Sequence, residues 1–122
     1  MDAELKVNRL NTTAFIASRK SKIVLTPRER VKANGGWKYQ EKAPRAEQTF
    51  RIIELGMNAT PPILNLTDGK QREAEFWLLG EWDAAVEIDD IWTAEDGRVW
   101  QVGDIVRSNE YEVRALVTER GK

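Results

Sequence analysis

The sequence has 122 residues, of which 41% are hydrophobic and 32% charged, enough apolar content for one modest core and too much for a disordered chain. It contains no cysteine and no histidine, which excludes disulfides, thiolate nucleophiles, the usual zinc ligands and the commonest general base. The net charge of −1 hides an asymmetry, because residues 1–45 carry eleven Lys and Arg against four acids, whereas residues 46–122 carry eight against sixteen. This pattern favours contacts between the two parts of the chain or between copies, and it argues against a general DNA-binding protein.

No apolar run approaches the roughly 18 residues that a membrane-spanning helix needs. The first residues, Met1-Asp2-Ala3-Glu4, are not typical of a secretory signal. We therefore expect a single domain over residues 1–122, made in the cytosol and not inserted in a membrane.

A helix is predicted in the N-terminal region, residues 1–20. Apolar residues recur there at the spacing of one helical face, and Asp2 stands where an N-cap is expected. These residues are Ala3, Val7, Leu10, Ala14 and Ala17. The stripe is thin, so we expect docking and not intrinsic propensity to stabilise the helix.

The remainder of the chain is predicted to form a β domain from residues 21–55 and 71–119. Asn34-Gly35-Gly36 is a hairpin signal, and β-branched or alternating segments recur at short intervals. The segments are residues 22–26, 28–32, 37–40, 48–55, 72–79, 85–93, 98–107 and 111–118. The pattern predicts a mainly β fold, a small barrel or sandwich of about six to seven antiparallel strands with an N-terminal helix and one long inserted loop.

The inserted loop, residues 56–70, is longer than most connections in compact domains. Ile63, Leu64 and Leu66 make it more apolar than a solvated loop needs to be. Two interpretations stay open. The loop folds back over its own barrel, or it binds a partner or gates a passage.

No catalytic, metal-binding or cofactor-binding residues are predicted. Asp89-Asp90 and Glu95-Asp96 are paired carboxylates, but adjacent residues of a strand point to opposite faces and do not converge on one substrate. The spacing of a calcium loop and the glycine patterns of nucleotide-binding loops are both missing. The sequence therefore does not predict an enzyme.

Basic and aromatic residues alternate in the predicted hairpin, as in Arg30, Lys32, Trp37, Lys38 and Tyr39. Surfaces that bind single-stranded nucleic acid use these residue types. The alternative is that Trp37 and Tyr39 face the core while the lysines face solvent.

An ordered series of residues resembles the head-to-tail stopper, or head-completion, proteins of long-tailed bacteriophages, especially those of actinobacterial hosts. The series covers roughly residues 22–118. It consists of Arg30-Val31-Lys32, Gly35-Gly36-Trp37, Arg45, residues 48–53 (QTFRII), residues 68–72 (DGKQR), residues 78–84 (LLGEWDA), Asp90-Ile91-Trp92, Asp96-Gly97, Val102, Asn109, Tyr111-Glu112, Arg114-Ala115 and Val117.

The resemblance implies a small β-barrel with an N-terminal helix. It also implies a structural virion protein that acts in virion assembly and genome packaging. Such a protein forms a homo-oligomeric ring, of six or twelve copies, in the head-tail neck after assembly in the host cytoplasm. Its partners would be a portal or adaptor on the head side, a tail terminator or tail tube on the tail side, and genomic DNA in transient contact with the channel. The long loop would line or gate that channel. The candidate residues are Thr60, Pro61, Pro62, Ile63, Leu64, Asn65, Leu66, Thr67, Asp68, Gly69, Lys70 and Arg72.

Charge and alternation predict two further sets of residues. The candidate subunit interface joins basic and acidic side chains of neighbouring copies, namely Arg28, Arg30, Lys32, Lys38, Glu81, Asp83, Glu87 and Asp89. The expected structural core includes Trp82, Trp92, Trp100 and Tyr111. Two alternatives to the stopper remain: another neck component, such as an adaptor or tail-completion protein, or a small barrel that binds single-stranded nucleic acid.

Overall fold

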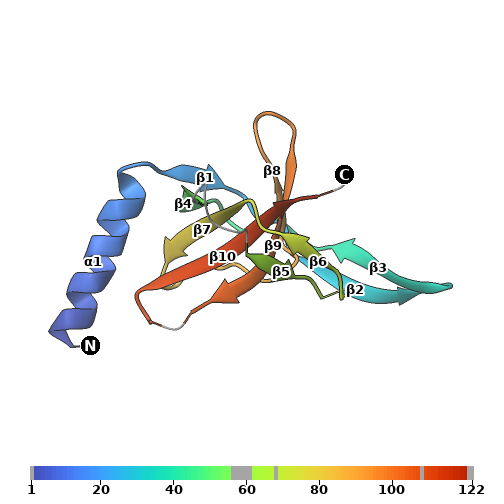
Figure 1. Cartoon of the computed structure of the whole chain (residues 1–122), viewed down its shortest axis with the longest axis horizontal. Helices are drawn as coiled ribbons and strands as arrows, with labels where there is room; N and C mark the ends of the chain where they lie inside the picture. The colour runs from blue at the N-terminus through green and yellow to red at the C-terminus, as the bar shows by residue number, and fades with distance from the viewer. Residues whose placement is uncertain (1, 56–61, 68, 108, 121–122) are drawn as a thin grey trace.

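The computed structural model describes residues 2–55, 62–67, 69–107 and 109–120, which form one helix and ten strands (Figure 1). The helix α1 (Ala3–Ala17) begins at Asp2, whose side chain accepts a hydrogen bond from the backbone N–H of Leu5 at 2.8 Å. The strands are β1 (Ser21–Ile23), β2 (Arg28–Ala33), β3 (Gly36–Glu41), β4 (Gln48–Glu54), β5 (Ile63–Asn65), β6 (Gln71–Glu73), β7 (Phe76–Glu81), β8 (Ile91–Thr93), β9 (Val99–Val106) and β10 (Glu112–Glu119).

Six strands form one antiparallel sheet in the order β1-β4-β7-β10-β9-β8. A bridge between Thr26 and Ile91 joins the two edges of this sheet, so that it curls into a nearly closed barrel. The predicted mainly β fold with an N-terminal helix is therefore confirmed. The strand pairs β2–β3 and β5–β6 form separate hairpins, and β2–β3 extends to the end of the molecule opposite α1 (Figure 1).

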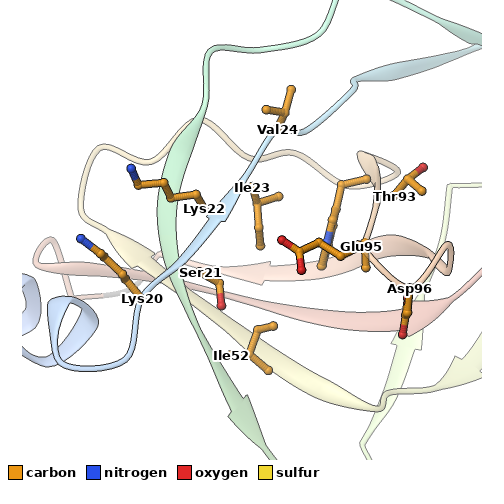
Figure 2. Close-up of a pocket in the computed structure, with 11 residues that line it drawn as sticks. Lys20, Ser21, Lys22, Ile23, Val24, Ile52, Thr93, Glu95 and Asp96 are labelled. Carbon is orange, nitrogen blue, oxygen red and sulfur yellow. The ribbon is translucent and has the colours of Figure 1, made fainter.

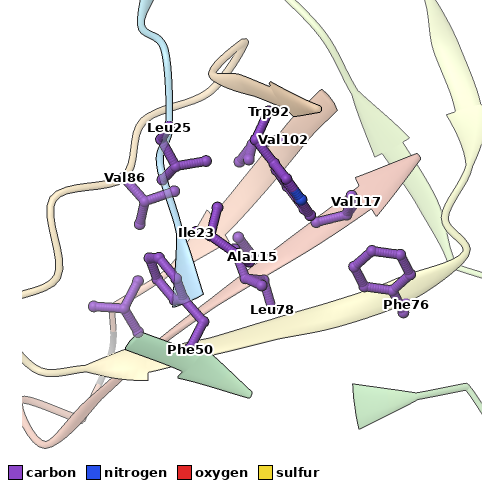
Figure 3. Close-up of a cluster of buried hydrophobic side chains, with 11 residues drawn as sticks. Ile23, Leu25, Phe50, Phe76, Leu78, Val86, Trp92, Val102, Ala115 and Val117 are labelled. Atoms are coloured by element: carbon purple, nitrogen blue, oxygen red, sulfur yellow. The ribbon is translucent and has the colours of Figure 1, made fainter. Parts of the chain in front are cut away.

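The barrel interior is filled by the inward-facing side chains of the six-stranded sheet and of the segments beside it (Figure 3). Phe76 contacts Trp100 and Trp92 edge to face, with ring centroids 4.8 and 6.2 Å apart. Trp92 is buried and Trp100 is partly buried against the same cluster, while Tyr111 is half-buried. Aromatic packing of this kind adds to the burial of apolar area in stabilising the barrel.

Trp82 lies outside the core, so its predicted place there is wrong. It follows the end of β7, its side chain is 47% exposed, and the Arg9 guanidinium lies 3.8 Å from the ring centroid. Side chains alternate between the two faces of a sheet only within a strand. Trp82 lies in the turn after β7, where the chain has left the sheet, so alternation does not predict its position.

Two predicted strands are interrupted. Only Ile91–Thr93 of the segment 85–93 is a strand, because the chain turns at Asp89, which has a φ of 75°. The segment 72–79 divides into β6 and β7, where the N–H of Ala74 donates to Pro62 and that of Glu75 donates to Val117. Ala74 thus still belongs to the β5–β6 hairpin, whereas Glu75 already bonds to β10, and the barrel strand β7 begins directly after it.

The helix contacts the barrel through a face other than its apolar stripe. Thr12 and Ile16 are buried, whereas Val7 and Leu10 are exposed, Leu10 by 61%. Polar contacts hold α1 in place. Thr13 Oγ1 donates to Glu81 Oε1 at 2.6 Å, and Arg9 Nε donates to the Glu110 carbonyl at 3.1 Å.

The described part of the long loop folds back over the barrel. Strand β5 pairs with β6, and Leu64 and Leu66 are buried with Ala74 and Leu116 in a second apolar cluster. A Cβ on Gly103 would come within 2.8 Å of Leu64, so the barrel backbone approaches the hairpin closely at this glycine. Their burial removes Leu64 and Leu66 from the candidate channel surface, since neither side chain reaches solvent.

Of the other candidate channel residues, Ile63, Asn65, Thr67, Gly69 and Lys70 are exposed. Pro62 and Arg72 are half-buried. The remaining candidates, Thr60, Pro61 and Asp68, lie outside the described residues.

Leu64→Ala should lower the free energy of unfolding by about 2–5 kcal/mol, because it leaves a cavity under the β5–β6 hairpin. Ile63→Ala, one residue away on the exposed side of the same strand, is the matched control and should change it by less than about 0.5 kcal/mol. Urea unfolding followed by far-UV circular dichroism measures both. Equal effects would show that the hairpin does not pack on the barrel.

Trp92→Ala should cost about 3–5 kcal/mol of stability, as the loss of a large core side chain does. Trp82→Ala should cost far less, because that ring is half exposed and contacts the surface side chain of Arg9. Thermal unfolding of the two variants compares them directly. If the Trp82 variant unfolded at as low a temperature as the Trp92 variant, the exposed position of Trp82 would be contradicted.

Candidate subunit interface

The β2–β3 hairpin, residues 28–41, forms a projecting basic arm. Its turn is at Asn34-Gly35, where Gly35 adopts a φ of 85° that glycine accepts readily. Lys32 and Lys38 are exposed near the tip, and Trp37, the cross-strand partner of Lys32, is 63% exposed. The predicted interpretation that Trp37 faces the core is wrong. The outer part of the hairpin extends beyond the barrel, so no barrel strand covers the Trp37 ring (Figure 1).

The base of the arm is fixed by a buried cluster around Asp89, whose side chain is 3% exposed. Arg28 Nε donates to the Asp89 carbonyl at 2.9 Å, and its guanidinium stacks on the Tyr39 ring with 4.1 Å to the centroid. The Asp89 carboxylate accepts hydrogen bonds from Tyr39 Oη at 3.3 Å and Gln101 Nε2 at 3.4 Å, and also from the Thr67 hydroxyl. One carboxylate thereby links the arm, the loop before β6 and the barrel strand β9.

Arg28 and Asp89 therefore do not belong to the candidate subunit interface. Both are buried against each other within one copy, where no neighbouring chain can reach them. Burial lowers the pKa of Arg28, and the nearby charge of Arg120 lowers it further. Asp89 and Tyr39 act in the opposite direction. Nη2 of Arg28 is buried and has no hydrogen-bond partner among the described residues.

Asp90 faces away from Asp89 and holds a different cation. Arg45 Nε donates to Asp90 Oδ2 at 2.9 Å, its Nη2 donates to Oδ1 at 3.3 Å, and the N–H of Glu87 also donates to Oδ2. The two neighbouring carboxylates thus serve separate structural contacts. Within the described ranges no group of three or more His, Cys, Asp or Glu is arranged to hold a metal ion.

Two of the predicted acidic residues, Glu81 and Asp83, line a hollow of about 320 Å³ together with Glu47. We call it the acidic hollow; Gln48, Thr49 and Ala84 complete its wall. It lies at the α1 end of the barrel, since Glu81 accepts a hydrogen bond from Thr13 of the helix. The arm lies at the opposite end (Figure 1). Glu87 is exposed but does not line the hollow.

A larger groove, of about 700 Å³, follows the gap between the edge strands β1 and β8 (Figure 2). Lys20 and Lys22 lie on one side of it, and Glu95 and Asp96 on the other, with Ile52 below. We call it the seam groove. Periodicity did not identify it, because the residue pattern of a strand does not reveal which of its edges stays unpaired. The paired carboxylates Glu95-Asp96 were the available hint in the sequence.

No protein-family model matches the chain, and no curated protein is closely similar to it in sequence. Among the residues described, no helix combines the length and the apolar character needed to cross a bilayer. Function is therefore inferred from the geometry of the chain together with the resemblance of its residues.

Asp89→Ala should destabilise the fold by about 3–5 kcal/mol, because it removes a negative charge that acts on the buried Arg28 and the acceptor for three side chains. Asp83→Ala removes an exposed carboxylate and should change stability by less than about 0.5 kcal/mol. Chemical denaturation gives both values. If the Asp89 variant were as stable as the Asp83 variant, the buried cluster would not hold the arm.

Proposed function

We propose that the chain is a structural protein of a bacteriophage neck, a head-to-tail stopper whose copies form a ring between the portal or adaptor and the tail. The ring retains packaged DNA and offers a docking surface to the tail. The residue series that resembles such proteins supports this, and so does the small barrel with an N-terminal helix that the resemblance implies.

The observation that carries the proposal is the projecting arm. A ring needs each copy to present two different surfaces that fit one another. The arm offers one of them, with an exposed Trp37 between Lys32 and Lys38 and with a base fixed by Asp89. Tryptophan is among the residues that most often dominate binding energy at interfaces, and the charges of Lys32 and Lys38 would orient the contact. Acidic side chains gather elsewhere on the barrel, in the acidic hollow and beside the seam groove.

The channel is assigned to the exposed face of the β5–β6 hairpin. Asp104 Oδ2 accepts hydrogen bonds from the backbone N–H of Asn65 at 3.0 Å and from its side chain at 3.1 Å. These bonds, together with the buried Leu64, tie the hairpin to β9. In the proposed ring this hairpin presents Ile63, Asn65 and Thr67 to the channel, while the copy number stays at six or twelve.

The competing functions differ in what they require. An adaptor is expected to be mostly helical, and the mainly β fold argues against it. A barrel for single-stranded nucleic acid is favoured by the same exposed Trp37, because bases stack on aromatic side chains beside basic ones. Tight, salt-sensitive binding of an oligonucleotide by the monomer, lost in Trp37→Ala, would establish that second function.

The ring is tested with an arm variant, Trp37→Ala combined with Lys38→Glu. Loss of a central interface residue typically costs 2 kcal/mol or more, so self-association should weaken at least about thirty-fold. Far-UV circular dichroism should stay unchanged, because neither side chain contacts the core. Sedimentation velocity measures the association. Val106→Ala, another exposed apolar position, is the control, and an equal effect of the two variants contradicts the role of the arm.

In the host that produces the particles, disruption of the gene should yield heads that lose DNA or fail to join tails. Electron microscopy counts filled, tailed particles with and without the gene. Normal numbers of filled, tailed particles would refute the stopper function.

A further inference from the structure

The barrel is open along part of one seam. Strand β1 pairs with β4 and strand β8 pairs with β9, which leaves the outer edge of each without a strand neighbour among the described residues. Thr26 and Ile91 exchange two backbone hydrogen bonds of 2.8 and 3.0 Å at one end of this seam. An antiparallel continuation would pair Val24 with Thr93, yet within the described ranges no ladder joins them. The seam groove is the space where this ladder stops.

The seam groove combines an apolar floor with two oppositely charged rims. Ile52, Ile23 and Trp92 line its depth, and Ile52 is partly exposed there. The cationic rim comes from Lys20 and Lys22, and the anionic rim from Glu95 and Asp96 (Figure 2). An unpaired strand edge beside such a floor is suited to an added extended segment, because backbone hydrogen bonds supply affinity and the floor accepts alternate side chains.

The arm has the features of such a segment. Its two strands pair only with each other, so their outer edges carry backbone groups without a strand neighbour in the described part of the chain. Its tip carries Trp37 beside Lys32 and Lys38, whereas at its base Glu29 pairs with Lys42 and Glu41 stands opposite Arg28. The net positive charge of the arm therefore lies at its tip, and it complements the anionic rim of the groove; opposite charges of this kind orient a contact.

We infer that the seam groove of one copy receives the arm of a second copy, with Trp37 on the floor of the groove and the edge of the arm extending the sheet. Lys32 and Lys38 then lie near Glu95 and Asp96. The inference rests on the proposed ring and names the surface to which its arm binds.

The acidic hollow is the competing receptor, and two features make it the poorer one. Its volume is less than half that of the seam groove, and Ala84 is the single apolar residue in its lining. Exposed charge pairs contribute little binding energy, so a surface that buries Trp37 is favoured over one that pairs charges alone.

The absence of cysteine from the chain allows a direct test by disulfide cross-linking. One full-length protein carries Asn34→Cys at the tip of the arm, and a second, distinguishable by a tag, carries Thr93→Cys at the rim of the groove. Mixed and oxidised at a concentration where the wild-type chain assembles, they should give a disulfide-linked heterodimer. The matched control replaces Thr93→Cys by Asp83→Cys, which is equally exposed but lies in the acidic hollow, and should give none.

Charge reversal provides an independent measurement. Glu95→Lys combined with Asp96→Lys should weaken assembly at least about tenfold, and adding Lys32→Glu and Lys38→Glu to the same chain should restore most of it. Glu47→Lys combined with Asp83→Lys reverses the charge of the acidic hollow, keeps the Thr13–Glu81 hydrogen bond of α1, and should leave assembly within about twofold of the wild type.

The outcomes separate the two proposals. Cross-linking through Thr93→Cys, with rescue by the reversed arm, supports the seam groove as the receptor. Cross-linking through Asp83→Cys alone, or loss of assembly on reversal at Glu47 and Asp83, overturns the seam groove and supports a ring with the hollow as receptor. A wild-type chain that stays monomeric up to the highest soluble concentration refutes the ring, and the seam contact with it.

Discussion

The buried carboxylate of Asp89 is the interaction on which the arrangement of the molecule depends. It accepts hydrogen bonds from Tyr39 at the base of the arm, from Thr67 after β5 and from Gln101 in β9. Its backbone carbonyl accepts from Arg28, and its left-handed conformation ends the turn before β8. Three segments far apart in the sequence are therefore positioned by one residue. A buried charge is costly unless it is fully paired, so small displacements of any of the three segments are opposed together.

The unequal distribution of charge along the sequence is partly neutralised inside one copy. Arg45 forms an ion pair with Asp90, and the charge of Asp89 acts on the buried Arg28, so two cations of the basic N-terminal third are matched to two acids of the remainder. Exposed charges include those of the arm tip and of the rims of the hollow and groove. Among the acids of residues 77–97, Asp89 and Asp90 are therefore buried and structural, whereas Asp83, Glu87, Glu95 and Asp96 are exposed.

Local signals in the sequence were sufficient for the helix, its Asp2 cap and the Asn34-Gly35 hairpin, because each depends on neighbours within a few residues. Local signals were insufficient wherever a partner distant in the sequence determines whether a side chain is buried. Asp89 is buried because Arg28 and Gln101 reach it across the fold, and Leu64 is buried because Gly103 leaves space for it. The sequence does not distinguish Trp82 from Trp92, since both are tryptophans in the same acidic stretch. Trp82 is exposed because β7 ends at Glu81, whereas Trp92 is buried because it lies within β8.

The polar docking of α1 has a consequence for the free energies of local unfolding. The helix buries only Thr12 and Ile16, and hydrogen bonds to the barrel replace others that water would make, so each contributes modestly. Separating α1 from β4 and β7 therefore requires much less free energy than opening the barrel, whose strands are joined by ladders around a common core. The chain thus consists of a cooperative barrel and a detachable helix, which can change its position while every strand stays paired.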